Sequence, residues 1–253
     1  MKHAKSKEKT TMKGIILAGG LGTRLHPLTR ITNKHLLPVY DKPMIYYPIE
    51  MLMKAGVDDV MVITGGNNSG DFLRLLGNGK QFGLKHLHYG YQEGEGGIAD
   101  ALKLCEDFVG RDKMIVALGD NIIEKNIRAF TDEFRRQAHG AKIILKEVSN
   151  PKEYGVAEVD GERIKKIIEK PKNPKTNLAV IGVYFYPNDV FKIINTLKPS
   201  KRGELEITDV NNAYLKKNQL TYNILDGWWQ DCGESKDTLL EANIFVKRHG
   251  ANH

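Results

Sequence analysis

The sequence predicts an α/β protein built on a Rossmann-like open sheet, mixed but mostly parallel, with helices on both faces. Short apolar runs without polar alternation recur along the chain and are typical of strands buried on both faces of a sheet. Segments with a helical pattern alternate with these runs, as in βαβ units. Apolar residues make up 41% and charged residues 27% of the 253 residues, which is globular composition and excludes a disordered or collagen-like chain.

The first half of the chain shows the strand–helix alternation most clearly. Its first predicted strand is apolar and is followed directly by a glycine-rich turn. Predicted helices end before glycines, which are common helix stop signals, as at Gly56 and Gly77. The predicted strands are residues 14–18, 60–64, 87–91, 114–118 and 141–148, and the predicted helices are residues 48–55, 69–76, 97–108 and 127–137.

The second half has shorter strands separated by turns. Asp160 and Gly161 form a predicted hairpin turn between two of them. No internal repeat or long linker interrupts the chain, so we predict one domain over residues 13–253, preceded by a disordered leader or tag remnant at residues 1–12. The predicted strands are residues 154–159, 164–169, 180–186 and 221–225, and the predicted helices are residues 189–197, 207–217 and 239–247.

Composition also narrows the compartment and the partners. No apolar run approaches the roughly 18 residues of a membrane span, and the N-terminus lacks an apolar signal core. Cys105 and Cys232 form no zinc or CxxC pattern, so we expect a reduced, cytoplasmic location. The net charge is +7, but no basic helix or aromatic-basic stripe is present. We therefore expect no nucleic-acid partner, and a mildly basic enzyme that handles phosphates fits the charge.

The loop after the first strand is the sharpest chemical signal. Residues 19–24 combine three glycines with Thr23 and Arg24, so backbone N–H groups can approach a phosphate chain and Arg24 can add a planar donor fork. The third glycine of a Rossmann fingerprint would fall at Leu25, and no Gly-Lys-Ser/Thr follows, so neither dinucleotide nor Walker binding is predicted. A simple tight turn is the alternative.

Three further charged residues are candidates for phosphate and metal binding. Lys34 opens a second loop, residues 34–39, and could reach a phosphate held by the glycine loop, although a lone lysine is usually a surface charge. Asp120 follows a buried strand at the sheet edge where ligands bind, so it could hold Mg²⁺ or cap a helix. Asp231 could complete that magnesium site, or simply precede a glycine turn.

Polar residues at other strand ends could recognise a sugar or a base. Glu169 can accept hydrogen bonds from sugar hydroxyls, and Lys170 can meet an anion, unless both are a solvated strand end. Gln92, with glycines after it, could offer a donor and an acceptor to a base edge, or belong to a plain loop. The Tyr184 hydroxyl needs a partner if it is buried.

Together these motifs resemble the sugar-1-phosphate nucleotidylyltransferases, whose order and spacing they share from about residue 13 to residue 246. Family members often carry threonine at the positions of Ile181 and Cys232, and longer members continue into C-terminal helices that serve assembly and product inhibition. The motifs are GGLGTRLHP (19–27), KHLLPV (34–39), LGDN (118–121), YGV (154–156), EKP (169–171), RGELEITD (202–209) and WQDCG (229–233).

The resemblance implies a GT-A-like nucleotidyltransferase fold with a nucleotide-binding part, about residues 13–125, and a sugar-phosphate-binding part, about residues 126–240. Arg24, Lys34, Asp120 and Lys170 would be catalytic, and Asp120 and Asp231 would hold Mg²⁺. The implied nucleotide-binding residues are Leu17, Ala18, Gly19, Gly20, Gly22, Thr23, Arg24, Gln92, Gly97 and Asp120. The implied sugar-phosphate-binding residues are Asn121, Gly155, Glu169, Lys170, Val180, Tyr184 and Arg202.

The implied reaction is Mg²⁺-dependent transfer of a nucleotidyl group from dTTP to glucose 1-phosphate, which gives dTDP-glucose and pyrophosphate. No general base is required, because the attacking phosphate oxygen is already an anion. The resemblance also implies supply of activated sugar for a surface polysaccharide, such as one that contains rhamnose. We expect a monomer or small homo-oligomer. The alternatives are a transferase that uses UTP or another sugar 1-phosphate, and an inactive nucleotide-sugar-binding regulatory module.

Overall fold

The computed structural model describes residues 11–253. The predicted leader therefore lies outside the described residues except for its last two positions. There the structure differs from the prediction, because Met12 begins the first strand. Thr11 also donates two hydrogen bonds to the Asp112 carboxylate, at 3.1 Å from its backbone nitrogen and 2.7 Å from its hydroxyl.

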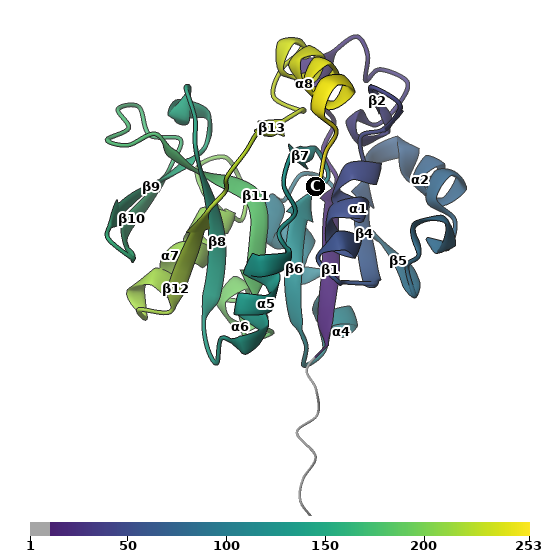
Figure 1. Ribbon diagram of the computed structural model, residues 1–253. Helices are drawn as coiled ribbons and strands as arrows, with labels where there is room; N and C mark the ends of the chain where they lie inside the picture. Colours follow the sequence, from purple (N-terminus) through teal and green to yellow (C-terminus); the bar gives the residue numbers. More distant parts are fainter. Residues whose placement is uncertain (1–10) are drawn as a thin grey trace, which may run out of the picture.

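One nine-stranded sheet runs through the molecule and confirms the predicted open, mixed sheet (Figure 1). Its centre is parallel, with β1 between β6 and β4, and β5 beyond β4. The antiparallel strand β11 joins this centre to the strands of the second half. The strands, in sheet order, are β10 (Arg163–Glu169), β9 (Gly155–Asp160), β11 (Leu178–Tyr186), β6 (Lys113–Leu118), β1 (Met12–Ala18), β4 (Asp59–Gly65) and β5 (His86–Gln92), with β8 (Ala141–Glu147) beside β11 and β12 (Leu220–Ile224) beside β8.

Helices cover both faces of the sheet, as predicted. Successive residues of β1 belong to different cores, with Ile15 and Leu17 on one face and Ile16 and Ala18 on the other. The first face packs against α3 (Ile98–Lys103), α4 (Glu106–Val109), α6 (Val190–Ile194) and α7 (Ile207–Lys216). The second packs against α1 (Tyr46–Lys54), α2 (Ser69–Leu76) and α5 (Arg128–Arg136).

A third core lies beyond the sheet and was not predicted from the sequence. It joins α8 (Lys236–His249), at the top of Figure 1, to two pairs of short strands. Leu239 and Val246 of α8 pack there with Leu25 and the buried Cys232. The strand pairs are β2 (Pro38–Val39) with β3 (Lys42–Pro43), and β7 (Asn121–Ile123) with β13 (Trp229–Asp231).

The predicted helix at residues 97–108 is wrong in one respect, because it is two helices. The chain breaks between α3 and α4, where Cys105 leaves helical geometry at φ −94° and ψ 2°. The predicted loop at residues 34–39 holds the 3₁₀ helix η2 (Lys34–Leu36) and β2. The remaining 3₁₀ helices are η1 (Thr23–Leu25), η3 (Gly66–Asn68), η4 (Lys80–Phe82) and η5 (Pro151–Glu153). Among the described residues, every helix is too short or too polar to cross a bilayer.

Candidate active site

A cavity of about 370 Å³ opens at the carboxyl ends of β1, β5 and β6, where open α/β sheets bind their ligands. It brings together residues from both halves of the chain. Of the residues singled out in the sequence, Ala18, Gly22 and Thr23 do not line it. Those that do are Leu17, Gly19, Gly20, Arg24, Lys34, Gln92, Gly97, Asp120, Asn121, Gly155, Glu169, Lys170, Val180, Tyr184, Arg202 and Asp231.

The glycine loop adopts the backbone that its sequence permits. Gly20 and Gly22 have φ of +90° and +62°, which side chains with a Cβ rarely adopt. A hydrogen bond stabilises this conformation of the loop, since the Gly22 carbonyl accepts from the Thr29 hydroxyl at 2.7 Å. Thr23 begins η1, and Arg24 is exposed and lines the cavity. The loop therefore presents backbone and one guanidinium to the cavity.

Lys34 and Asp120 both line the cavity and form an ion pair, with 2.5 Å between Lys34 Nζ and Asp120 Oδ2. The side chains are only 14% and 7% exposed, so water screens the pair weakly. The other Asp120 oxygen accepts a hydrogen bond from Asn121 Nδ2 at 3.1 Å. No helix follows Asp120, since the next residue begins β7, and the helix-capping alternative is therefore wrong.

Asp231 reaches Asp120 because β13 pairs with β7. The pairing places Asp231 opposite Asn121, and the Cys232 N–H donates to the Asp120 carbonyl at 2.9 Å. The turn interpretation of Asp231 also holds, because its Oδ1 accepts from the Gly233 N–H at 2.9 Å. A Cβ at Gly233 would lie 2.5 Å from Asp120 Oδ2 and 2.8 Å from Lys34 Nζ. Only glycine at position 233 lets the turn pack this closely against the Lys34–Asp120 ion pair.

The two acids differ in charge state because their neighbours differ. Burial alone would raise the pKa of Asp120, but the Lys34 ammonium holds that pKa well below its ordinary value. Burial, followed by the nearby charge of Asp120, raises the pKa of Asp231 to about 7. Burial would lower the pKa of Lys34, but Asp120 and Asp231 raise it above its ordinary value. At neutral pH the cluster therefore holds a charged lysine, a charged Asp120 and a carboxyl close to its titration point.

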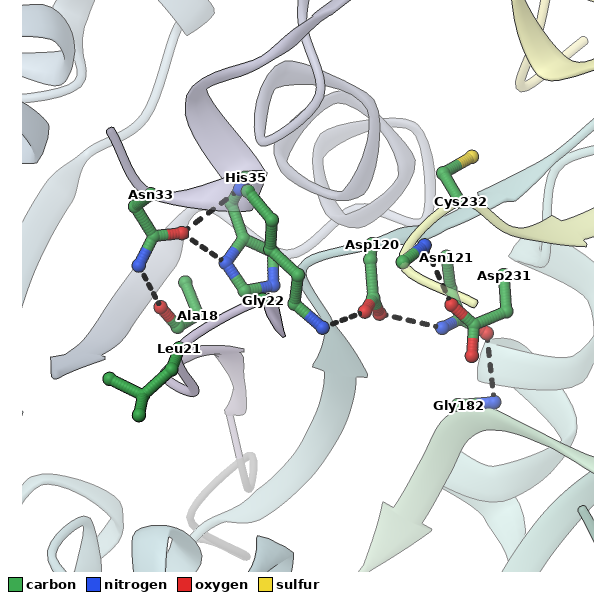
Figure 2. A network of polar contacts seen from close by, with 12 residues as sticks. Ala18, Leu21, Gly22, Asn33, His35, Asp120, Asn121, Gly182, Asp231 and Cys232 are labelled. Atoms are coloured by element: carbon green, nitrogen blue, oxygen red, sulfur yellow. Dashed lines mark hydrogen bonds and ion pairs between the residues drawn. The ribbon is translucent and has the colours of Figure 1, made fainter. Parts of the chain in front are cut away.

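A buried, neutral histidine follows Lys34 in the chain and lies next to the cluster of Lys34, Asp120 and Asp231. His35 is 1% exposed, and burial, followed by the Lys34 charge, lowers its pKa to about 3. Its Nδ1 lies 2.7 Å from Asn33 Oδ1, which also accepts from the His35 N–H at 2.9 Å. Asn33 in turn donates to the Ala18 carbonyl at 3.4 Å (Figure 2). These contacts fix the loop that carries Lys34 to the end of β1.

The other side of the cavity is built by the second half of the chain. Glu169 Oε2 accepts from the Thr208 hydroxyl at 2.5 Å, and a Cβ at Gly155 would crowd both residues. Lys170 has φ of +40°, an unusual value for a residue with a side chain. It is exposed, lines the cavity and makes no salt bridge within residues 11–253. Arg202 instead binds Glu206, at 2.7 and 3.1 Å.

Several lining residues received no role from the sequence. Tyr154 donates a hydrogen bond to Glu234 and lies 5.3 Å, centroid to centroid, from Trp229. Trp229 Nε1 donates to Asn121 Oδ1 at 2.7 Å. These contacts join segments distant in the sequence, so no local pattern could reveal them. The unassigned lining residues are His35, Glu95, Ile98, Ala101, Leu118, Glu153, Tyr154, Gly182, Glu204, Ile207, Thr208, Trp229 and Glu234.

A family profile described as nucleotidyl transferase matches residues 13–249. The chain belongs to the nucleotidyl transferase family. It is 46% identical over 242 residues to a glucose-1-phosphate thymidylyltransferase of Neisseria meningitidis, covering 93% of this chain and 83% of that protein. It is 46% identical over 241 residues to the enzyme of the same name in Mycolicibacterium smegmatis, covering 93% and 82%. The family resemblance in the sequence is thereby confirmed.

Solved structures confirm the nucleotidyltransferase fold. A Bacillus anthracis protein described as a glucose-1-phosphate thymidylyltransferase, solved with sucrose, superposes with a TM-score of 0.90 at 51% identity, covering 94% of this chain and 96% of that one. A UDP-glucose pyrophosphorylase solved with UDP-glucose gives a TM-score of 0.80 at 26% identity, covering 94% and 99%. This nucleotidyl transferase therefore shares its fold both with a protein named for thymidylyl transfer and with one named for UDP-glucose.

Proposed function

We propose that this nucleotidyl transferase is a glucose-1-phosphate thymidylyltransferase, which converts dTTP and glucose 1-phosphate to dTDP-glucose and pyrophosphate. One observation carries the proposal. A single cavity is lined by four cationic side chains, Arg24, Lys34, Lys170 and Arg202, and by acidic side chains that include Asp120 and Asp231. Two polyanions must meet in this reaction, and cationic side chains placed beside their phosphates would oppose the repulsion. The names of the relatives support the choice of base and sugar.

The side chains divide between the two substrates. The loop from Leu17 to Arg24 would hold the triphosphate, with Arg24 and Lys34 on its phosphates, and Gln92 and Gly97 would read the pyrimidine. Glu169 would accept hydrogen bonds from the sugar hydroxyls. Lys170 would meet the sugar phosphate, since it makes no salt bridge among the described residues. The two halves of the cavity thus hold the two reactants against each other.

The proposed step is an in-line displacement at the α-phosphorus. An oxygen of the sugar phosphate forms the new bond to phosphorus, and the bond to the β-phosphate oxygen breaks, so that pyrophosphate leaves with the electron pair. Lys34 and Arg24 stabilise the charge that develops on the α-phosphate and on the leaving group. No proton needs to be removed from the nucleophile, and positioning supplies much of the remaining acceleration.

Asp120 and Asp231 fit a magnesium site. They supply hard carboxylate oxygens, Asp120 from the residue before β7 and Asp231 from the end of the paired strand β13, and Mg²⁺ is commonly held by one or two carboxylates with the substrate's phosphates. Burial, and then the charge of Asp120, raise the pKa of Asp231, so the two acids lie within electrostatic reach of each other. Bound there, Mg²⁺ would neutralise charge on the triphosphate and help to align it.

The direct experiment is a pyrophosphate-release assay over a matrix of nucleotides and sugars. We would combine dTTP, UTP, CTP, ATP and GTP with several sugar 1-phosphates, each with and without Mg²⁺. The proposal expects the highest kcat/KM for dTTP with glucose 1-phosphate, and little turnover after chelation. Higher kcat/KM for UTP would support the UTP-dependent alternative. Nucleotide-sugar binding without any turnover would support the regulatory module and contradict the proposed enzyme.

A further inference from the structure

The side-chain amide of Gln92 is held in one orientation by two acceptors. Gln92 ends β5 and is 7% exposed. Its Nε2 lies 2.8 Å from Asp100 Oδ2 and 3.2 Å from the Gly97 carbonyl oxygen. A carboxylate and a backbone carbonyl only accept hydrogen bonds, so the amide nitrogen, which carries both N–H donors, must face them. The two donors that the sequence left available to a base are therefore used within the protein.

The amide oxygen of Gln92 is consequently the atom left for a ligand. Within residues 11–253 it makes no hydrogen bond, and Gln92 lines the cavity beside the glycine loop. A Cβ at Gly19 would lie 3.3 Å from this oxygen, which places the oxygen against the loop that would hold the triphosphate. At this position the Gln92 side chain therefore presents a hydrogen-bond acceptor to a ligand in the cavity and no donor.

Asp100 is itself fixed for this contact. It lies in the first turn of α3, and a Cβ at Gly96 would overlap its carboxylate, so the carboxylate packs against the backbone of the preceding turn. Among the described residues Asp100 makes no salt bridge, and its carboxylate accepts a side-chain hydrogen bond only from Gln92 Nε2. Gly97 contributes the second acceptor with φ of +93°, where a Cβ would lie 2.8 Å from the Leu205 carbonyl oxygen.

We propose that Asp100 is a specificity-determining residue that orients Gln92, so that Gln92 presents only its Oε1 to the base. This inference rests on the proposed function. Thymine and uracil carry an N3–H donor on the edge that pairs, where cytosine N3 carries a lone pair. An oxygen held in this orientation binds the first two bases and repels cytosine N3. Asp100 does not touch the nucleotide, and it acts through Gln92 as a positioning residue.

The test compares Asp100→Ala with Asp100→Asn. Both remove the negative charge, but only asparagine keeps an oxygen that can accept from Gln92 Nε2. The measured quantities are kcat/KM for dTTP, dUTP and dCTP with glucose 1-phosphate. In Asp100→Ala the dTTP/dCTP ratio should fall about tenfold or more, which corresponds to about 1.4 kcal/mol and is the scale of one misplaced polar partner. The dTTP/dUTP ratio should not change, because both bases have N3–H. Asp100→Asn should keep both ratios near those of the unaltered chain.

Two outcomes would overturn the inference. One is an unchanged dTTP/dCTP ratio in Asp100→Ala, whether or not activity falls equally for all three nucleotides, and the other is a fall of that ratio in Asp100→Asn as large as in Asp100→Ala. Asp100→Ser, whose hydroxyl is too short to reach the amide, replaces Asp100→Ala if the latter does not fold. Equilibrium binding of the same nucleotides gives the same ratios without turnover. Turnover by the unaltered chain therefore decides the proposed function, and the binding ratios decide the role of Asp100.

Discussion

Arg24 offers a direct test of the proposed charge stabilisation, because the fold makes little use of its side chain. It is exposed, lines the cavity and makes no salt bridge among the described residues. Arg24→Ala should therefore lower kcat about 100- to 1000-fold, the range seen when one charge-stabilising donor is removed, and leave the melting temperature nearly unchanged. Arg30→Ala, at an exposed position outside the cavity, is the matched control. Near-normal pyrophosphate release by a folded Arg24→Ala variant would contradict the role of Arg24.

His35 should make the fold sensitive to acid. Its pKa is about 3 in the folded protein, because of burial and then of Lys34, against 6.5 for an exposed histidine. A depressed histidine pKa means that the unfolded chain binds the proton more readily. This contribution to stability is therefore present above pH 6.5 and is lost as pH falls toward 3. In His35→Gln, unfolding by urea should depend less on pH between 6.5 and 4 than in the parent.

Exposed His139 provides the comparison for that measurement. His139→Gln should keep the pH dependence of the parent across the same range. Equal slopes in the parent and in His35→Gln would show that His35 does not contribute to acid unfolding. The sequence showed His35 only as part of a loop, because its burial depends on contacts with Asn33 and with the chain near Gly119. The sequence thus predicts which chemical groups single residues carry, but not how deeply those groups are buried or which neighbours they contact.

At the scale of elements, the turn after β13 closes the site. A Cβ at Gly233 would meet Asp120 Oδ2 at 2.5 Å and Lys34 Nζ at 2.8 Å. Gly233→Ala should therefore separate Asp231 from Asp120 and lower kcat/KM at least about tenfold. The Mg²⁺ concentration that gives half-maximal activity should rise. The control is Gly70→Ala in α2, where nothing lies within 4 Å of the added methyl and φ is ordinary. That variant should keep activity and gain about 0.4–1 kcal/mol of stability.

The elements that the sequence predicted are those with strong local patterns. Helix α2 occupies the predicted residues 69–76, and the central strands differ from prediction by a residue or two at their ends. The pairs β2–β3 and β7–β13 were missed because two or three residues are too few to show periodicity. The second pair brings Asp231 to Asp120, so the contact that completes the predicted metal site was the least visible in the sequence.

At the scale of the whole molecule, the cavity is assembled from both halves of one sheet. The parallel centre supplies the glycine loop, Gln92 and Asp120, while the antiparallel second half supplies Glu169, Lys170 and Tyr184. The sequence predicted the two sets separately, because each follows a strand or a turn with its own motif. Their meeting in one cavity depends on β11, which lies antiparallel to β6 and is hydrogen-bonded to β8 and β9 on its other side. That arrangement is a property of the folded chain.

Metal binding should couple the site to the stability of the whole fold. With a pKa of about 7, the Asp231 carboxyl favours the folded state at low pH, and this contribution is lost as pH rises from about 4 through 7. The proposed Mg²⁺ would bind the ionised form, so in the presence of dTTP it should raise the melting temperature more at pH 8 than at pH 6. Asp231→Asn should reduce both shifts and remove most of the difference between them. The protonation of dTTP itself changes between pH 6 and pH 8, but it changes in the same way with the parent and with Asp231→Asn. Its effect therefore cancels when the two proteins are compared. Equal Mg²⁺-induced shifts at the two pH values in the parent would exclude Asp231 as a metal ligand that titrates near neutrality.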